Sequence, residues 1–169
     1  MSDAGCGVAH GHTAEGPAAD RVLVAVFASP VAAALLRLGV ECGFAPVLVD
    51  PAGREVGGLP EGTATLAAVP ADPHADVVVC DHRRDELGAV LRDALATGTR
   101  WVGLMGNPRH EGPHVAALAA LGVPPEEVAR VHRPIGLDIG SRTPAEIAVS
   151  TLAGLLADRN GRSGGQLAR

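Results

Sequence analysis

The stretch that decides the fold is residues 21–50, RVLVAVFASPVAAALLRLGVECGFAPVLVD. It opens with an unbroken apolar run at residues 21–27, which predicts a buried strand. The Ala/Leu-rich segment 31–42 predicts a helix, and a second apolar run at residues 46–49 predicts another strand. A strand, a helix and a further strand in this order predict a βαβ unit with parallel strands.

The residues that flank the predicted helices support this interpretation. Ser29 can cap the first helix, Pro30 fits its first turn, and Gly43 is a usual C-terminal stop. Near the other end of the chain, Thr143 and Glu146 bracket Pro-Ala and match a capping box. A final helix is therefore predicted to begin there.

The alternation of strands and helices continues along the chain. Strands are predicted at residues 65–69, 76–80 and 101–105, and helices at 85–96, from the turn at 106–108 through 121, at 125–130 and at 143–157. Continuous apolar strands separated by helices indicate parallel pairing covered on both sides. We predict an α/β, Rossmann-like doubly wound, mostly parallel sheet of about five strands with helices on both faces. It occupies residues 21–158, between a flexible arm (1–20) and a flexible tail (159–169).

Composition narrows the function classes. The chain has 169 residues, 47% of them hydrophobic, and a formal net charge of −5. It contains no Lys and no Tyr, which excludes Schiff-base chemistry, a Walker-type nucleotide site and a Tyr–Lys proton-transfer pair. A mildly acidic chain gives no electrostatic footprint for nucleic acid or an anionic membrane, so neither is expected as a partner.

The cellular compartment of the protein is predicted from its cysteines and its N-terminal residues. Cys6, Cys42 and Cys80 are widely spaced and odd in number, which favours a reducing cytoplasm over a disulfide framework. Residues 1–20 lack the basic and apolar regions of a signal peptide, and no apolar run is long enough for a membrane span. We expect Cys42 and Cys80 to be small core residues.

Ligands of doubly wound sheets bind beyond the carboxyl ends of the strands. The first such turn, F-A-S-P-V-A around Ser29, has no glycine, whereas a dinucleotide fingerprint has three. Asp50 follows Ser29 at the distance expected of an acid that holds a ribose hydroxyl. An NAD(P)-binding oxidoreductase and a fold with another ligand both remain open.

A second turn suits an anion better. Gly106, Asn107 and Arg109 lie between a predicted strand and a predicted helix, where free amides and an arginine can hold a phosphate. An ordinary Asn-Pro turn is the alternative.

Two tracts raise the question of metal binding. Cys6, His10 and His12 place a thiol and two imidazoles close together in the arm, either as a transition-metal site or as an adventitious one. Residues 110–114 read H-E-G-P-H, which matches a zinc-protease pattern, but Gly112 and Pro113 interrupt the helix that this pattern needs. We predict no dedicated metal site and treat that match as accidental.

Three segments together resemble one family. Residues 133–149 read RPIGLDIGSRTPAEIAV, residues 101–106 read WVGLMG, and the strand at residues 76–80 is followed by Asp81-His82. These segments, within a resemblance over residues 21–157, are similar to the C-terminal Rossmann domain of the xanthine dehydrogenase accessory proteins (XdhC/CoxI).

The resemblance implies a chaperone that is not a turnover enzyme. Such proteins bind the molybdenum cofactor, protect it while a cysteine desulfurase partner adds a sulfide, and deliver it to an apo molybdenum hydroxylase; they are usually homodimers. Cofactor contacts are then expected at the strand ends and in the loop after residue 133, from Ser29, Asp50, His82, Gly106, Asn107, Arg109, Gly136, Asp138 and Gly140. A non-catalytic interaction or metal-handling protein that uses the Cys/His arm is a further alternative.

Overall fold

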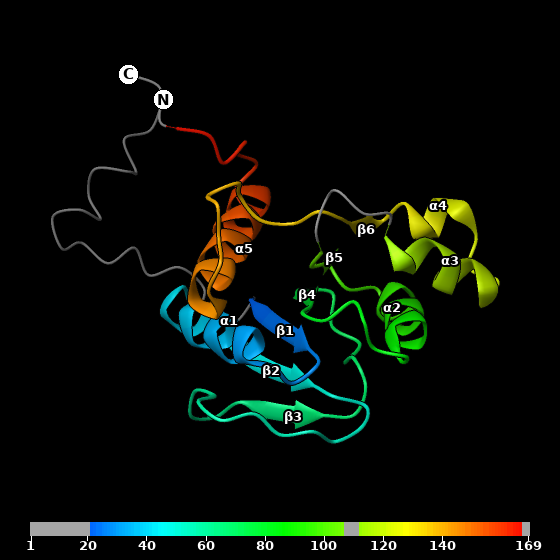
Figure 1. Cartoon of the computed structure of the whole chain (residues 1–169), viewed down its shortest axis with the longest axis horizontal. Helices are drawn as coiled ribbons and strands as arrows, with labels where there is room; N and C mark the ends of the chain where they lie inside the picture. The colour runs from blue at the N-terminus through cyan, green and yellow to red at the C-terminus, as the bar shows by residue number, and fades with distance from the viewer. Residues whose placement is uncertain (1–20, 107–111, 167–169) are drawn as a thin grey trace, which may run out of the picture.

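The computed structural model describes residues 21–106 and 112–166 (Figure 1). All strand pairs in this part of the chain are parallel, and they form one sheet in the order β3-β2-β1-β4-β5-β6. The strands are β1 (Val22–Val26), β2 (Ala45–Val49), β3 (Ala64–Leu66), β4 (Ala75–Val79), β5 (Trp101–Leu104) and β6 (Val131–His132). This is the Rossmann order, in which the strands added after β1 lie on one side of it up to β3 and on the other side from β4 on, so that the order switches between β1 and β4. The predicted fold class is confirmed.

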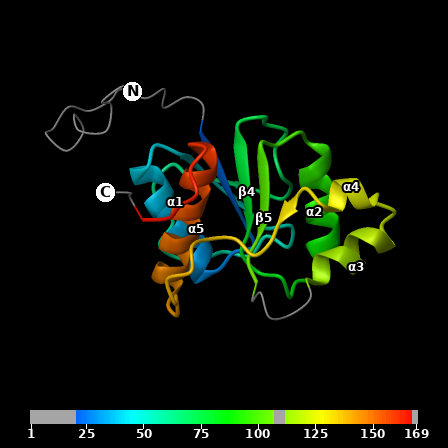
Figure 2. The same cartoon turned by 90° about the horizontal axis from the view of Figure 1, so that it is seen from above.

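Helices cover the sheet on both faces, as Figure 2 shows when β4 and β5 are seen from above. The helices are α1 (Pro30–Glu41), α2 (Leu87–Ala96), α3 (Pro113–Ala120), α4 (Pro125–Val128) and α5 (Pro144–Arg159). The side chains of α1 and α5 share one core cluster with Leu23, Leu48 and Val78. The side chains of α2 share the opposite cluster with Leu118 of α3 and the alternate strand residues. None of these helices is both long and apolar enough to cross a membrane.

Capping residues recognisable in the sequence define the starts of α1 and α5. Ser29 is the N-cap of α1, and its side-chain oxygen accepts a hydrogen bond from the amide of Ala32 at 3.2 Å. Thr143 caps α5, and both hydrogen bonds of the predicted capping box are present. These caps satisfy helix-end amides that would otherwise lack partners.

The structure differs from the sequence prediction at the sheet edges and at α3, which begins at Pro113 rather than at the turn 106–108, because Gly112 has an extended backbone and Pro113 fits the first helical turn. The edge strand β3 has three residues, all exposed, where a strand over residues 65–69 was predicted. The two-residue strand β6 was not predicted, because Val131 and His132 carry no strand pattern of their own and are held by pairing with β5. At the C-terminus, α5 continues to Arg159, two residues beyond its predicted end.

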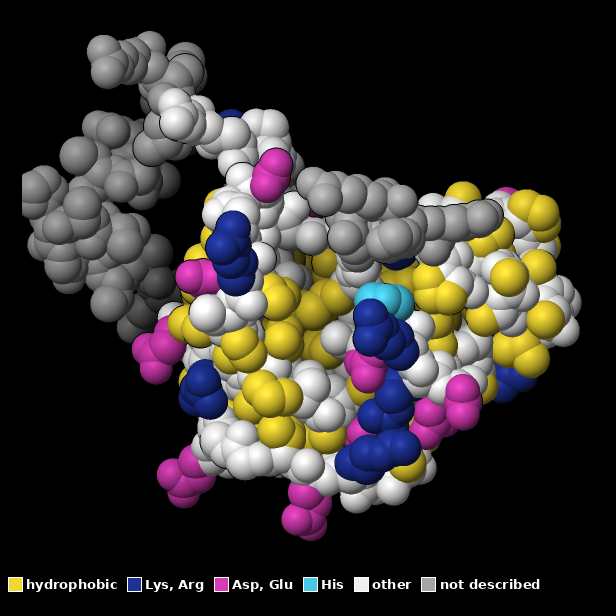
Figure 3. Space-filling view, in the orientation of Figure 1, with side chains coloured by type: hydrophobic (Ala, Val, Ile, Leu, Met, Phe, Trp, Pro, Cys, Tyr) yellow, Lys and Arg dark blue, Asp and Glu magenta, His cyan; other side chains and the backbone are white. Residues whose placement is uncertain are grey.

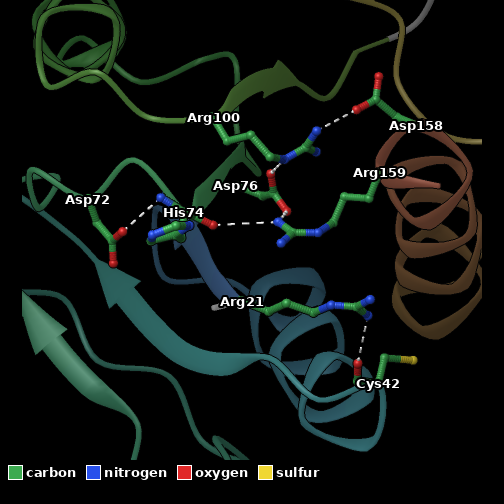
Figure 4. A network of polar contacts seen from close by, with 8 residues as sticks. All are labelled: Arg21, Cys42, Asp72, His74, Asp76, Arg100, Asp158 and Arg159. Atoms are coloured by element: carbon green, nitrogen blue, oxygen red, sulfur yellow. Dashed lines mark hydrogen bonds and ion pairs between the residues drawn. The ribbon is translucent and has the colours of Figure 1, made fainter. Parts of the chain in front are cut away.

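An ion-pair network joins α5 to the amino end of β4 (Figure 4). The fully buried carboxylate of Asp76 accepts hydrogen bonds from Arg100 and from Arg159, the latter at 2.6 Å. Arg100 also pairs with Asp158 at 2.8 Å. Burial raises the pKa of Asp76, although hydrogen bonds from both arginines oppose the shift. The network therefore holds the C-terminal end of α5 against β4, and burial of the Asp76 carboxylate opposes this stabilisation.

Removing the Asp76 carboxylate should destabilise the protein. Asp76→Ala leaves Arg159 and Arg100 without their shared partner, and breaking a buried pair costs about 3 kcal/mol. Urea unfolding measures the change, with Asp93→Ala as the control because Asp93 is an exposed partner of Arg92. An Asp76→Ala protein as stable as the control would contradict this role.

Candidate functional site

A cavity of about 470 Å³ opens at the carboxyl edge of the sheet. It lies at the strand-order switch, between the first turn of α1 and the first two turns of α5. Its lining residues are Val31, Cys80, His82, Met105, Gly106, Ile135, Ser141, Ile147, Ser150 and Thr151. Figure 3 shows hydrophobic side chains gathered in a hollow beside α5, bordered by arginine and acidic side chains. The floor is thus apolar, and hydroxyls lie on the α5 side.

A second cavity, of about 690 Å³, adjoins the first along the loop that follows β6. It is lined by residues 134–142 and shares Gly106, Ile135 and Ser141 with the first cavity. Asp138 and Arg142 contribute charged side chains to its wall. The two cavities together form one groove that runs from the strand ends to the start of α5.

The loop at residues 134–140 is shaped by close contact with α5. The amide of Leu137 donates to the carbonyl of Ser150 at 3.1 Å, and the Ser150 hydroxyl donates to the carbonyl of Leu137. Gly136 has φ +91°, and a Cβ placed on it would lie 2.6 Å from Ser150 Oγ. A Cβ on Gly154, one turn further along α5, would lie 3.1 Å from the Gly136 Cα. Only glycines allow the loop and the helix to approach this closely.

The backbone amides at the start of α5 have hydrogen-bond acceptors within the chain. The Glu146 carboxylate accepts hydrogen bonds from the amides of Arg142, at 2.7 Å, and Thr143, at 2.9 Å. Those two backbone hydrogen bonds lower the pKa of Glu146. The capping box thus holds the loop entry in place and leaves the Arg142 side chain exposed on the wall of the second cavity.

Asp50 closes the turn after β1. Its side chain is fully buried and accepts hydrogen bonds from the amides of Ala28 and Ala52, both at 3.0 Å. Phe27, where the dinucleotide fingerprint has its first glycine, takes a left-handed φ of 72°. A non-glycine residue in this conformation costs of order 1 kcal/mol, which the Asp50–Ala28 bond and burial of the ring offset. The carboxylate at the position that would hold a ribose in a dinucleotide site therefore stabilises this turn through hydrogen bonds to backbone amides.

Two sulfur-containing residues, Cys80 and Met105, line the first cavity beside His82. Met105 belongs to the core cluster formed with α1 and α5, and the two cysteines predicted as core residues, Cys42 and Cys80, are partly buried and pack against that cluster. Burial raises the pKa of the Cys80 thiol to about 12. The thiol is therefore protonated at neutral pH and is not an activated nucleophile.

His114, the last residue of the H-E-G-P-H match, and Arg133, the first residue of the family-like segment, lie close enough to interact electrostatically. His114 is buried in the first turn of α3, and burial together with the nearby Arg133 charge lowers its pKa. The Arg133 guanidinium lies against Gly106, where an added Cβ would be 2.8 Å from Nε. Since α3 begins at Pro113, His114 stands at the helix start; His110 and Glu111 lie outside the described residues.

The structure brings together a subset of the predicted site residues. His82, Gly106, Gly136, Asp138 and Gly140 line the groove. Ser29 and Asp50 are used as a helix cap and a turn anchor and do not line either cavity. Asn107 and Arg109, like Cys6, His10 and His12, lie outside the described residues. Within residues 21–106 and 112–166, no three His, Cys, Asp or Glu side chains are grouped to hold a metal.

The sheet order, with a crevice at its switch point, defines a Rossmann-type domain. The model of the XdhC Rossmann domain matches residues 23–155, so the chain belongs to this family. The resemblance found in the sequence is confirmed.

Two individual proteins are similar to the chain. The uncharacterized protein YqeB of Escherichia coli K12 is 33% identical over 104 residues, which cover 60% of this chain and 18% of YqeB. A Bacillus halodurans protein, whose crystal structure is described as that of a xanthine dehydrogenase, superimposes with a TM-score of 0.64 at 22% identity. That match covers 84% of this chain and 45% of the other, and it supports the fold alone. The chain spans less than half the length of either protein.

The loop–helix contact predicts unequal effects of two alanine substitutions. Gly136→Ala introduces both left-handed strain and a clash with Ser150, so it should cost clearly more than about 1 kcal/mol. Gly140→Ala is the matched control, because Gly140 also has a positive φ, +68°, but an added Cβ meets nothing within 4 Å. Chemical unfolding compares the two. Equal losses of stability would show that the contact with α5 contributes nothing.

The lowered pKa of Glu146 predicts a pH-dependent contribution to stability. The carboxylate stabilises the folded state above its unfolded pKa of about 4.3, and this contribution disappears as the pH falls through the lower folded-state pKa. Glu146→Gln should therefore lower the melting temperature at pH 7, and the gap should close in acid. Exposed Glu41→Gln is the control. A gap that is constant down to pH 3 would rule out the ionised cap.

Proposed function

We propose that this protein is an accessory factor for the maturation of a molybdenum hydroxylase of the xanthine or carbon monoxide dehydrogenase type. It acts as a chaperone that binds molybdenum cofactor and delivers it, and it is not itself an enzyme. The proposal is supported by membership of the XdhC Rossmann-domain family over residues 23–155. The observation that carries it is the groove at the switch point, because this is where Rossmann-type folds bind ligands.

The groove suits a molybdopterin-type ligand in size and chemistry. Cavities of about 470 and 690 Å³ fall within the range that accommodates small ligands. The apolar wall of Val31, Ile135 and Ile147 can cover a pterin ring, and the Thr151 and Ser141 hydroxyls can bond its polar edge. Arg142 supplies a cation to the second cavity for the phosphate. We place Gly106, Gly136 and Gly140 in the backbone that approaches the ligand, with His82 and Asp138 at its sides.

The partners follow from this role. An apo molybdenum hydroxylase receives the cofactor, a cysteine desulfurase adds the terminal sulfide beforehand, and the carrier works as a homodimer in the reducing cytoplasm. The chain's formal net charge of −5 fits protein partners rather than nucleic acid. The mature activity belongs to the recipient enzyme.

Filling the groove with charge should abolish cofactor binding. Ile147→Glu places a carboxylate on the wall of the first cavity, where it occupies space and repels an anionic ligand. Ala145→Glu is the matched control, because Ala145 is exposed on the same helix and does not line either cavity. Molybdenum cofactor released from a purified molybdoenzyme is titrated into each protein, after circular dichroism confirms folding. We expect at least a tenfold weaker affinity for Ile147→Glu alone.

Two results would reject the proposal. The first is equal cofactor affinity in Ile147→Glu, Ala145→Glu and the unmodified protein. The second is saturable quenching of the single tryptophan, Trp101, by NAD(H), which would favour the oxidoreductase alternative. The buried Asp50 carboxylate predicts that NAD(H) up to millimolar concentration leaves this fluorescence unchanged.

A further inference from the structure

We propose that Cys80, His82 and Met105 form a binding site for a soft, monovalent metal ion, for which Cu(I) is the probe. The three side chains line the same cavity at the carboxyl edge of β4 and β5. This inference does not rest on the proposed function, because it concerns the donor atoms of the chain alone.

The strand register places the two sulfur-containing residues beside each other. Val79 is the partner of Leu104 in the parallel β4–β5 pair, and the amide of Met105 continues the ladder by donating to the carbonyl of Val79 at 3.0 Å. Cys80 and Met105 are therefore neighbours on adjacent strands, which lie about 4.8 Å apart. Two sulfur atoms at this spacing can both reach one ion at about 2.3 Å from each.

Both side chains are on the same face of the sheet. Met105 belongs to the core cluster formed with α1 and α5, and Cys80 packs against that cluster. His82 follows Cys80 by two residues, is half-buried and lines the same cavity. A thiol, a thioether and an imidazole thus surround one accessible space from two neighbouring strand ends.

This donor set selects a particular class of ion. Thiolate and thioether ligands favour Cu(I), whereas Zn²⁺ sites are built from several Cys, His or acidic side chains. The described part of the chain has no cluster of three such zinc-type side chains. Met105 is the donor that distinguishes a copper(I) site from a site for a borderline divalent ion.

The binding step balances without a redox partner. The Cys80 S–H bond breaks, its proton leaves to solvent, and a sulfur–metal bond forms to an ion that arrives already as Cu(I). The charges of the thiolate and the monovalent ion cancel, so the buried site remains neutral. In the absence of the ion, burial keeps this thiol protonated, with its pKa at about 12.

The test is an anaerobic Cu(I) titration of the full chain in competition with bicinchoninate. The starting protein carries Cys6→Ser, His10→Asn and His12→Asn, which remove the soft donors of the N-terminal tract. We expect one Cu(I) per chain. Met105→Leu, which keeps an apolar side chain of similar size, should weaken binding at least tenfold, and Cys80→Ala should abolish it. Cys42→Ala, which removes the other described thiol, is the matched control and should bind as the starting protein does.

The sulfur ligands have a spectroscopic signature. X-ray absorption at the copper edge should show a shell of two sulfur atoms and one nitrogen, and one sulfur should be lost in Met105→Leu. If Cys80→Ala does not fold, Met105→Leu and Cys80→Ser carry the test. Unchanged Cu(I) affinity in Met105→Leu, or a loss caused by Cys42→Ala instead, would overturn the proposal. The titration contains no molybdenum cofactor, so its outcome is separate from that of the cofactor experiment.

Discussion

The contact between the loop after β6 and helix α5 is the constraint on which the groove depends. Gly136 and Gly154 let two backbones approach so closely that a Cβ on Gly136 would lie 2.6 Å from Ser150 Oγ and a Cβ on Gly154 would lie 3.1 Å from the Gly136 Cα. The paired hydrogen bonds between Leu137 and Ser150 then fix the loop in one register against the helix. Because this loop forms the wall of the second cavity and contributes Ile135 to the first, the shape of both cavities follows from one close approach.

A different constraint governs the turn after β1. In a dinucleotide site this turn needs glycines, and the acid at the end of β2 holds a ribose. Here Phe27 adopts the left-handed conformation, Asp50 bonds the amide of Ala28, and the Arg84 guanidinium lies 4.7 Å from the Phe27 ring centroid. The Asp50 carboxylate and the Ala28 amide, which lie where a dinucleotide site recognises its ligand, are thus bonded to each other and stabilise the turn. The cavity proposed to hold the ligand is instead lined by residues at the ends of β4 and β5, among them His82 and Gly106.

Sequence patterns predicted the features that depend on residues close together in the chain. The βαβ unit, the Ser29 cap and the Thr143–Glu146 capping box are determined within a few residues, and all are present. β6 was missed because a two-residue strand exists only through its partner β5. The spacing of Asp50 from Ser29 matches the fingerprint, but spacing could not reveal that the amides of Ala28 and Ala52 donate to its carboxylate. Ser150 and Gly154 are small residues four positions apart, so they lie on one face of α5. This pattern in the sequence could have predicted that another backbone packs closely against that face, as the glycine-containing loop does.

The groove also brings together two kinds of side chain that lie far apart in the sequence, namely hydroxyl and arginine side chains and sulfur-containing side chains. At the α5 end, hydroxyl groups and Arg142 offer hydrogen bonds and positive charge, which suit an anionic, polar ligand. At the strand ends, Cys80 and Met105 offer sulfur, and their adjacency is visible only once the β4–β5 register is known. A ligand that is hard and charged at one end and soft at the other would satisfy both ends at once. The cofactor proposal and the soft-ion proposal meet in the first cavity, because the apolar wall assigned to the pterin and the sulfur residues assigned to the soft ion both line it, whereas the cation assigned to the phosphate lines the second cavity.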